Sequence, residues 1–414
     1  MKKTPKSLRL HIGIFGRTNV GKSSFLNLIA GQDVAITSPV AGTTTDVVEK
    51  TMELLPVGPV VFLDTAGIND ISVLAEQRIG KTKKIFDRSD FIILIAEPGV
   101  WTEYEDCILE EAGKRSIPYI IVVNKTDCMP VDTFFLETLK RKTSRILLCS
   151  SIFQENRDEY VNRLKQFLLE CAPDEFLHSP PLIGDLLPPG GVAVLIVPID
   201  LQAPKGRLIL PQVQTIRDAL DNDAGVVVVK EREYAHVLRN LKNHPDLVVC
   251  DSQVVLKMIA DTPVDVKCTT FSMLFSRYKG DLIESVRGAM RIDTLKPGDK
   301  VLIAEACSHH AIEDDIGRVK IPRWLRQYAG FDVTIDICSG KDYPENLKEY
   351  ALVVHCGGCM LTRREMLSRI AKAREAGIAI TNYGVCVSLL QGVLSRTLSP
   401  FPAARELLPK KCTL

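Results

Sequence analysis

Short apolar runs recur along the chain, and segments long enough for a helix separate them. Up to about residue 170 these runs are rich in β-branched residues, and they are LHIGIF (10–15), VVFLD (60–64), FIILIA (91–96), YIIVV (119–123) and ILLCS (146–150). Continuous apolar runs of this length are typical of parallel strands that are buried on both faces. We therefore predict an open α/β sheet with crossover helices, ending with a helix over residues 164–171.

Two further α/β patterns follow a break that holds five prolines between Ala172 and Gly191. The first has strand-like runs at residues 192–200, 226–230 and 247–251, with helices expected over 212–221 and 233–241. The second has runs at residues 300–307, 332–338, 351–356 and 378–384, with a helix expected over 363–376. We predict three α/β domains with mainly parallel sheets, which are residues 1–172, 180–262 and 263–414. The middle domain shows no catalytic constellation, so we expect it to be a spacer or an association module.

The composition narrows the classes of protein that fit. The 414 residues are 46% hydrophobic and 25% charged, and the formal net charge is +1. This balance gives no reason to expect nucleic acid or an anionic membrane as a partner, and the apolar runs are too short to cross a bilayer. The basic N-terminus leads directly into a glycine-rich loop, so we expect no signal peptide and a cytoplasmic protein. Twelve cysteines are too few for a disulfide scaffold, and closely spaced ones indicate metal or redox chemistry.

A phosphate-binding motif lies between the first predicted strand and a helix. Gly16-Arg-Thr-Asn-Val-Gly21-Lys22-Ser23 has the pattern GxxxxGK[ST] in the context that this pattern requires. Backbone N–H groups of such a loop surround the phosphates, helped by the positive end of the following helix. We expect Lys22 to reach the β- and γ-phosphates and the Ser23 hydroxyl to bind magnesium, with Ser24 next to it in the nucleotide site.

Three further motifs follow strands at the spacing expected of a GTPase. Asp64-Thr-Ala-Gly67 ends VVFLD; Asp64 is expected to hold the magnesium shell, and the Gly67 N–H to sense the γ-phosphate. Asn124-Lys125-Thr126-Asp127 follows IIVV, and a carboxylate there accepts two hydrogen bonds from guanine that adenine cannot offer. Ser150 and Ser151 follow ILLC, where a loop that backs the base belongs. The sequence therefore predicts GTP as the nucleotide.

These motifs resemble those of the translation-factor-related GTPases, and within them the Era/TrmE-like branch. Residues 42–46, GTTTD, resemble the switch I motif of that branch, which implies Thr44 as a magnesium ligand. Ile68 stands where Ras-like GTPases place a catalytic glutamine, so a water-positioning side chain is missing there. Some members of the branch hold a potassium ion with an asparagine of the phosphate loop, and Asn19 matches that asparagine. The alternative for Asn19 is a residue that stabilises its own turn.

Cysteines and histidines gather after two runs of the third domain. One group is Cys307-Ser-His309, and the other is His355-Cys356-Gly-Gly-Cys359. Both groups lie just past the carboxyl ends of predicted strands, where open α/β sheets place ligands, so we expect them to converge. The spacing of Cys356 and Cys359 allows both sulfurs to face one metal. From these residues alone, zinc and an iron–sulfur cluster both stay open, and the histidines are either ligands or groups that support the ligands.

The combination resembles the HydF family of FeFe-hydrogenase maturation GTPases, and the resemblance covers essentially the whole chain. It includes residues 203–217, APKGRLILPQVQTIR, which look like the dimerisation domain of that family. The family implies a 4Fe–4S cluster that is held by three cysteines, which by match are Cys307, Cys356 and Cys359. A cubane cluster has four irons, so the fourth takes a weaker ligand. The candidates are His309, His355, Asp314 in the acidic run 313–315, and solvent.

The same resemblance implies a scaffold and carrier. Two radical-SAM maturases would supply a diiron precursor, and the chain, expected to be a homodimer, would deliver it to the FeFe-hydrogenase apoprotein. GTP hydrolysis is then expected to gate the exchange of partners. Because Ile68 cannot orient water, the reaction from GTP to GDP and phosphate is expected to be slow and to be activated by potassium.

Two other functions fit parts of the pattern. An RNA-modification or ribosome-assembly GTPase with a structural zinc domain would carry the same GTPase motifs, but the third domain shows no basic, aromatic-rich patch. A redox enzyme would use Cys356 and Cys359 as an exchanging dithiol, but this interpretation leaves Cys307 unexplained. We therefore predict the maturation GTPase.

Overall fold

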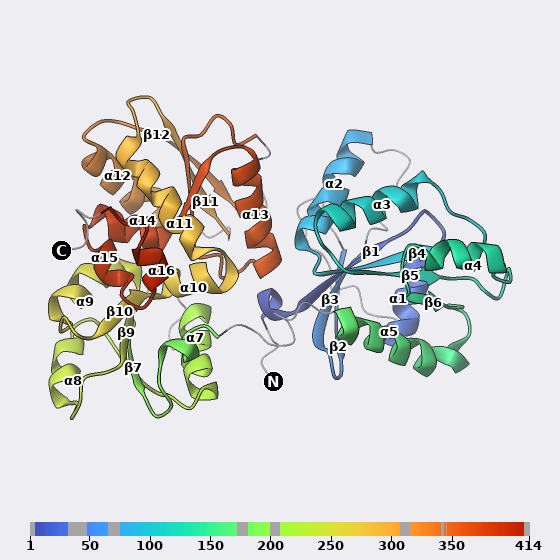
Figure 1. Cartoon of the computed structure of the whole chain (residues 1–414), viewed down its shortest axis with the longest axis horizontal. Helices are drawn as coiled ribbons and strands as arrows, with labels where there is room; N and C mark the ends of the chain where they lie inside the picture. Colours follow the sequence, from blue (N-terminus) through green and yellow to red (C-terminus); the bar gives the residue numbers. More distant parts are fainter. Residues whose placement is uncertain are drawn as a thin grey trace. The chain divides into compact units, whose positions relative to one another are not determined.

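The chain divides into two compact units, Met1–Ser179 and Pro180–Leu414, and both are α/β (Figure 1). The computed structural model describes residues 5–31, 48–64, 75–171, 181–198, 208–306, 315–340, 343–344 and 346–409. Among these residues, no helix is both long enough and apolar enough to span a membrane. The α/β architecture of both units confirms the predicted fold class.

The first unit is built on a six-stranded sheet in the order β2-β3-β1-β4-β5-β6. Its strands are β1 (Leu10–Phe15), β2 (Val48–Leu54), β3 (Gly58–Asp64), β4 (Phe91–Ala96), β5 (Tyr119–Val123) and β6 (Ile146–Leu148). All five predicted runs form strands, and the pairs among them are parallel. The sequence did not predict β2, which pairs antiparallel with β3 at the edge of the sheet.

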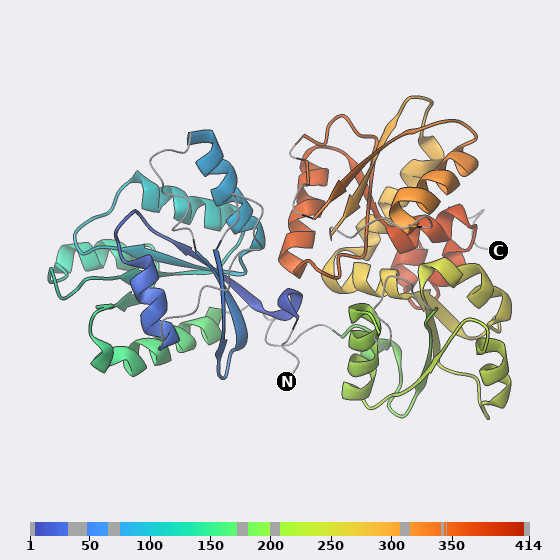
Figure 2. The ribbon, with the colours of Figure 1, turned by 180° about the vertical axis from the view of Figure 1, so that it is seen from behind.

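Helices cover both faces of this sheet, as the two opposite views show (Figures 1 and 2). They are α1 (Lys22–Ala30), α2 (Ala75–Arg88), α3 (Glu103–Lys114), α4 (Thr133–Lys140) and α5 (Arg157–Cys171). One core joins α1 and α5 through Phe25 and Leu164, and another joins α2 and α3 through Ile85 and Ile108. The central strands supply side chains to both cores, which is why their sequences are apolar without alternation.

The second unit contains two four-stranded sheets, in the orders β10-β9-β7-β8 and β12-β11-β13-β14. The strands of the first are β7 (Val192–Ile196), β8 (Gly225–Val229), β9 (Leu247–Cys250) and β10 (Lys267–Thr270). The strands of the second are β11 (Lys300–Glu305), β12 (Thr334–Ser339), β13 (Leu352–His355) and β14 (Ala379–Asn382). Every pair is parallel. Each apolar run predicted for this part of the chain contains one of these strands.

The middle sheet extends beyond the boundary that we expected at residue 262. Strand β10 pairs with β9, with Cys268 opposite Val248, so residues up to Thr270 belong to this sheet. The sequence missed β10 because KCTT is short and contains no large aliphatic residue. One continuous core, from Leu182 to Leu408, includes residues of both sheets.

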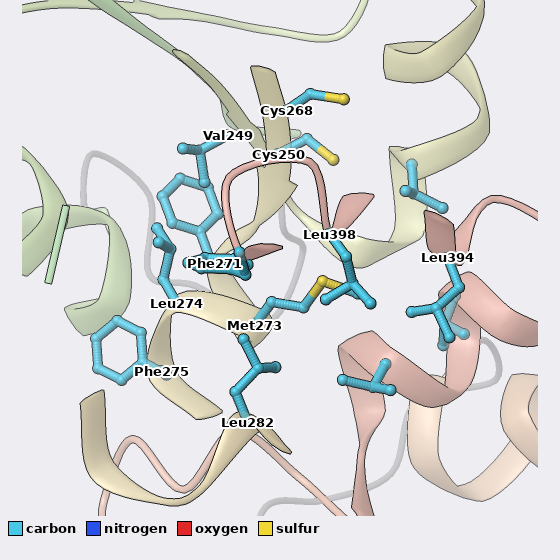
Figure 3. Packing of buried hydrophobic residues seen from close by; sticks show 14 of the residues in the cluster. Val249, Cys250, Cys268, Phe271, Met273, Leu274, Phe275, Leu282, Leu394 and Leu398 are labelled. Carbon is cyan, nitrogen blue, oxygen red and sulfur yellow. The ribbon is translucent and has the colours of Figure 1, made fainter. Parts of the chain in front are cut away.

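The helices of the second unit are α7 (Leu210–Asp221), α8 (Tyr234–Asn240), α9 (Val255–Asp261), α10 (Phe271–Lys279), α11 (Leu282–Ala289), α12 (Ile321–Ala329), α13 (Arg363–Glu375), α14 (Tyr383–Leu390), α15 (Leu394–Thr397) and α16 (Pro402–Arg405). A π-helical turn, Ile316–Lys320, leads into α12. Helix α10 follows β10 directly, and its residues Phe271 and Met273 lie among side chains of β9, β10 and the C-terminal helices (Figure 3). It also contacts α7 as well as α13 and α14. Helix α10 thus connects the cores of the two sheets.

Candidate functional site

The phosphate-binding motif forms a loop between β1 and α1 that only glycine permits at two positions. Gly16 and Gly21 have φ angles of +152° and +91°. A Cβ atom at Gly16 would lie 2.5 Å from the carbonyl oxygen of Ile95, and one at Gly21 would lie 2.3 Å from Nδ2 of Asn124. The backbone of the loop therefore packs directly against the neighbouring elements.

Three predicted nucleotide-site residues are exposed on this loop and on the first turn of α1; they are Asn19, Ser23 and Ser24. Asn19 has a φ angle of +66°, in the left-handed region that asparagine tolerates better than most residues. The first N–H groups of a helix have no acceptor inside the helix and carry its positive end. The start of α1 can therefore bind a phosphate group.

The ammonium group of Lys22 is held inside the loop. Nζ donates to the carbonyl oxygens of Gly16 at 2.7 Å and of Arg17 at 2.8 Å, and the residue is only 6% exposed. Burial lowers the pKa of Lys22, and the nearby carboxylate of Asp64 opposes this effect. Asp64 is itself buried at the end of β3. The predicted residues Thr44 and Gly67 lie outside the described ranges.

Asn124 links the end of strand β4, the phosphate loop and the loop that contains Ser151. Its backbone N–H donates to Ala96 at 2.9 Å, and its Nδ2 donates to the carbonyl oxygen of Val20 at 2.9 Å. Its Oδ1 accepts from the backbone N–H of Ser151 at 3.1 Å and from the Ser151 hydroxyl at 2.8 Å. The phosphate loop and the predicted base-backing loop are thereby fixed to each other.

The carboxylate of Asp127 lies next to Ser150, the residue before Ser151. The hydroxyl of Ser150 donates to Oδ1 of Asp127 at 2.6 Å, and this bond, followed by one from Cys128, lowers the pKa of Asp127. The ammonium of Lys125 pairs with Glu97. The structure thus brings Asn124, Asp127, Ser150 and Ser151 together, with an ionised carboxylate that can accept hydrogen bonds from guanine.

Helix α3 supports the phosphate loop, and sequence reasoning missed this contact. Glu105 is fully buried and accepts from Nε of Arg17 at 2.8 Å. It also accepts from the N–H and the hydroxyl of Thr102, at 2.9 and 2.6 Å, which completes a capping box. Burial raises the pKa of Tyr104 to about 12, opposed by a backbone hydrogen bond with Gly16. The pattern Thr-x-x-Glu is a signal for the cap, but not for its contact with the loop.

The two cysteine groups follow neighbouring strands, as predicted. Strands β11 and β13 pair in parallel with Ala304 opposite His355, so the residues after both strands lie at the same edge of the sheet. The backbone N–H of Ala306 donates to Sγ of Cys356 at 3.1 Å. The residue after Ala306 is Cys307, which lies outside the described ranges together with His309 and Asp314. The structure therefore brings Ala306, the residue before the first group, to the sulfur of Cys356 in the second group.

Both ring nitrogens of His355 lie at hydrogen-bond distance from a partner, one from the backbone of Cys356 and the other from Arg369. Nδ1 lies 2.7 Å from the carbonyl oxygen of Cys356, and Nε2 lies 2.9 Å from Nη1 of Arg369. A carbonyl only accepts and a guanidinium only donates, so Nδ1 carries the proton and Nε2 accepts. Burial, with a contribution from Arg369, lowers the pKa of His355 to about 3. The imidazole is neutral with both nitrogens engaged, which favours a supporting role over that of a ligand.

Two buried cations, neither of which was predicted, hold His355 and the segment after it: Arg369 contacts His355, and Lys279 contacts the segment. Arg369 also donates to the carbonyl oxygen of Gly340 at 2.7 Å and stacks over the ring of Tyr343 at 4.8 Å. The ammonium of Lys279 donates to the carbonyl oxygens of Cys359 at 3.0 Å and of Leu361 at 2.9 Å. Burial raises the pKa of the Cys359 thiol, and Lys279 opposes this effect.

The residues around Cys356 fit an iron–sulfur group. Thiolates are its preferred ligands, and an N–H bond to a ligand sulfur, as from Ala306, is one of the contacts that tune it. In the part of the chain that the structure describes, Nδ2 of Asn382 and the hydroxyl of Tyr383 are buried without a hydrogen-bond partner. Asn382 lies opposite His355 in the β13–β14 pair, at this same sheet edge. A bound polar group would relieve the cost of these atoms, about 1–3 kcal/mol each.

A complete metal site is not visible within the described ranges, where no three His, Cys, Asp or Glu side chains are grouped to hold a metal ion. Cys356 and Cys359 are both partly exposed cysteines. The third predicted cysteine, Cys307, is outside those ranges. The ligand set of three cysteines therefore stays a prediction.

The fold and the two nucleotide loops define the first unit as a P-loop GTPase domain, and residues 11–125 match the family described as 50S ribosome-binding GTPase. Residues 182–280 match the hydrogen maturase F dimerization domain, and residues 283–400 match the hydrogen maturase F tetramerization domain. The chain therefore belongs to the hydrogen maturase F (HydF) family, and the resemblance drawn from the sequence is confirmed. The tetramerization domain is a finding that the sequence analysis did not anticipate.

The proteins similar to this chain include several tRNA modification GTPases. The MnmE protein of Prochlorococcus marinus is 34% identical over 171 residues, which is 40% of this chain and 35% of that protein. MnmE of a Synechococcus species is 42% identical over 125 residues, which is 29% of this chain and 26% of that protein. The chain thus spans about a third of the length of these relatives or less. A solved structure of the Era GTPase of Aquifex aeolicus matches with 19% identity and a TM-score of 0.33, covering 55% of this chain and 97% of that one.

Proposed function

We propose that the chain is a GTP-hydrolysing scaffold that holds a 4Fe–4S cluster and delivers a diiron precursor to FeFe-hydrogenase. The observation that carries the proposal is the union of two sites in one chain of the hydrogen maturase F family. One is a P-loop with a guanine-type recognition loop. The other is the segment 356–361, called the cysteine loop, in which the sulfur of Cys356 accepts a hydrogen bond from the N–H of Ala306.

Hydrolysis of GTP would use the residues around the phosphate loop. Lys22 would leave its two carbonyl partners and offset the charge that develops on the β- and γ-phosphate oxygens. Ser23 and Thr44 would hold a magnesium ion, and Asp64 would hold its water shell. The ion supplies charge neutralisation at the phosphates. The N–H of Gly67 would contact the γ-phosphate.

Guanine would be selected by Asp127. Its carboxylate accepts the N1–H and the exocyclic amine of guanine as a bidentate pair, and adenine offers no equivalent pair of donors. The hydroxyl of Ser150 would keep the carboxylate ionised and oriented. Asn124 and Ser151 act less directly, because they fix the base loop to the phosphate loop. Lys125, paired with Glu97, would border the base.

Potassium would assist a reaction that is otherwise slow. Ile68 has no group that can orient the attacking water, and unaided GTPases of this kind are slow. The side chain of Asn19 is exposed on the phosphate loop, where its oxygen can bind a monovalent cation next to the phosphates. The positive charge of that cation would act on the same oxygens as Lys22.

The cysteines Cys307, Cys356 and Cys359 would hold the cluster through three irons, and the cluster supplies a soft, redox-active docking point. His355 would serve as a support for the loop, because both of its nitrogens are engaged. His309, Asp314 or solvent would then occupy the fourth position. A ligand of this kind leaves more readily than a thiolate, because the irons prefer sulfur donors.

The diiron precursor would be substrate and cargo. Its suppliers would be two radical-SAM maturases, its acceptor would be the apoprotein of FeFe-hydrogenase, and the carrier would act as a homo-oligomer in the cytoplasm. The two matched domains are named for dimerization and tetramerization, which supports an assembly of several copies. Nucleotide state would then set which partner is bound.

The metal content of the protein purified without oxygen tests the proposal. Iron and sulfide in equal amounts support it, whereas zinc would favour an RNA-modification or ribosome-assembly GTPase, and no metal would favour a dithiol enzyme. Cys356→Ala and Cys359→Ala should lose the iron, while the matched control Cys386→Ala, a buried thiol of α14, should keep it. Iron retained by both loop variants would overturn the cluster assignment.

A steady-state GTPase assay tests the first site. Lys22→Ala should abolish hydrolysis, because it removes the ammonium that neutralises the phosphate oxygens. Cys359→Ala should hydrolyse GTP at the wild-type rate, because it lies in the second unit. A Lys22 variant with wild-type turnover would show that the active-site assignment is wrong.

A further inference from the structure

Lys279, the last residue of α10, is a lysine with almost no exposure to solvent. Its relative exposure is 1%. Its Nζ donates to the carbonyl oxygens of Leu361 at 2.9 Å, of Cys359 at 3.0 Å and of Gly358 at 3.4 Å. All three acceptors belong to the segment that begins at Cys356 and leads into α13. An ammonium group has three donors, so this one loop takes all of them.

Within the part of the chain that the structure describes, no carboxylate is hydrogen-bonded to Lys279. Its polar contacts there are the three carbonyl oxygens. Glu365, the acidic residue of the following helix, caps α13 through the N–H of Thr362 at 2.9 Å. Burying a cation without an anion costs several kcal/mol, and carbonyl oxygens return only part of that cost. The anionic or acidic groups near enough to act on this charge are the thiols of Cys359 and Cys356 and the carboxylate of Glu365.

The helix that carries Lys279 is anchored away from the loop. Its first residue, Phe271, packs in the core that contains Val249 of β9 (Figure 3). The residue before Lys279, Tyr278, offers its carbonyl oxygen to Nη1 of Arg363 at 2.7 Å, at the start of α13. The ammonium is therefore presented by a rigid element, which is what a positioning residue requires.

We propose that Lys279 is the positioning residue of the cysteine loop and that it places a fixed positive charge beside the ligand sulfurs. This inference rests on the proposed function. It goes beyond that function in assigning two separate tasks to one side chain. The donors gather the carbonyl oxygens of Gly358, Cys359 and Leu361, which fixes the turn between the sulfurs before any metal arrives. The charge stabilises thiolates and an anionic cluster, and it favours the reduced cluster over the oxidised one.

Three substitutions separate the two tasks. Lys279→Met removes both donors and charge while keeping an unbranched apolar chain, Lys279→Gln keeps donors without charge, and Lys279→Arg keeps both. The matched control is Lys257→Met on α9, where the lysine side chain is 46% exposed and its ammonium pairs with Asp261. Circular dichroism and gel filtration of each full-length variant establish that it is folded. If Lys279→Met fails to fold, Lys279→Gln carries both measurements, because it removes the charge and has two N–H donors where the ammonium has three.

Hydrogen–deuterium exchange of the metal-free chain measures the first task. Exchange at residues 358–361 should accelerate about tenfold or more in Lys279→Met, because three charge-assisted hydrogen bonds are lost. Lys279→Gln should show a smaller acceleration, and Lys257→Met none. This measurement does not depend on a cluster, so it tests Lys279 even if the proposed function fails. Unchanged exchange in Lys279→Met would overturn the positioning role.

An EPR-monitored redox titration of the reconstituted chain measures the second task. The midpoint potential should shift to more negative values in both Lys279→Met and Lys279→Gln, because both lack the charge, and should stay near wild type in Lys279→Arg and Lys257→Met. Equal potentials in all variants would overturn the electrostatic role. A wild-type chain that takes up no iron would instead contradict the proposed function, and the exchange measurement would still decide the positioning role.

Discussion

Glu105→Ala should destabilise the folded conformation of the phosphate loop, although Glu105 is not among the residues expected to contact GTP. Glu105 is fully buried on α3 and accepts three hydrogen bonds, one from Arg17 and two from Thr102. Arg17 provides one of the two carbonyl oxygens that hold the ammonium of Lys22. Glu105→Ala therefore acts on the catalytic lysine through one intermediate residue.

The expected loss of stability can be worked out from these contacts. Loss of the capping box costs about 1 kcal/mol. Loss of the ion pair costs about 1 kcal/mol more, because the side chain of Arg17 is 30% exposed and water screens part of its charge. The one buried methylene group of Glu105 that alanine lacks adds about 1 kcal/mol. The sum is about 3 kcal/mol, a large part of the 5–15 kcal/mol that stabilises a typical domain.

Urea unfolding followed by tryptophan fluorescence measures this loss. The chain has two tryptophans, Trp101 beside the cap residue Thr102 and Trp324 in α12 of the second unit. In a Trp324→Phe background the signal reports the first unit alone. Binding of a fluorescent GDP analogue should weaken about tenfold in the same variant, because the loop must be ordered before it can hold phosphates.

The control is Glu110→Ala in the same helix, where the carboxylate is 66% exposed and pairs with Lys114. It should leave both the urea midpoint and the nucleotide affinity at wild-type values. If Glu105→Ala behaves like this control, the contact between α3 and the phosphate loop is not a support. A loss of stability with unchanged nucleotide affinity would show that Glu105 serves only the helix cap.

Three further predictions concern single side chains. Asp127→Asn should lower the affinity for GTP and raise it for xanthosine triphosphate in competition assays, because an amide can donate to the xanthine oxygen; equal changes for both would contradict the bidentate pair. Replacing sodium with potassium at constant ionic strength should raise GTP turnover, and Asn19→Ala should remove most of the gain; equal rates in both salts would leave Asn19 as a turn residue. Arg369→Met should lower the iron content after reconstitution, because His355 and Gly340 lose their donor, and unchanged iron would show that this contact is dispensable.

The central strands could be predicted because of where they lie. Strands such as β4 (FIILIA) and β5 (YIIVV) are buried on both faces, so their apolar runs are continuous and need no knowledge of the partner strands. Edge strand β2, with the sequence VEKTMEL, has charged residues at positions 49, 50 and 53 that interrupt any apolar run, and its pairing with β3 depends on a turn. Strand β10 was missed for a related reason, since KCTT shows no apolar run at all.

The nucleotide site could be predicted because its residues are contiguous in sequence. The loop from Gly16 to Ser23 and the loop from Asn124 to Asp127 each carry a motif whose spacing follows from one turn between a strand and a helix. The contact between Arg17 and Glu105 joins residues 88 positions apart. No local pattern specifies such a pair, because it depends on how α3 is placed against the sheet.

The sequence does contain a signal for Lys279 and Arg369, the two cations next to the cysteine loop. Each is a charged residue on an otherwise apolar face of a helix. The buried face of α10 contains Phe275 and, four residues later, Lys279. The buried face of α13 contains Met366, Ile370 and, between them, Arg369. A helix places residues three and four apart on one face, so each cation is turned towards the interior with its apolar neighbours. Because a buried cation needs acceptors, both helices indicate a cluster of carbonyl oxygens or an anion, and both point to the loop that carries the cysteines.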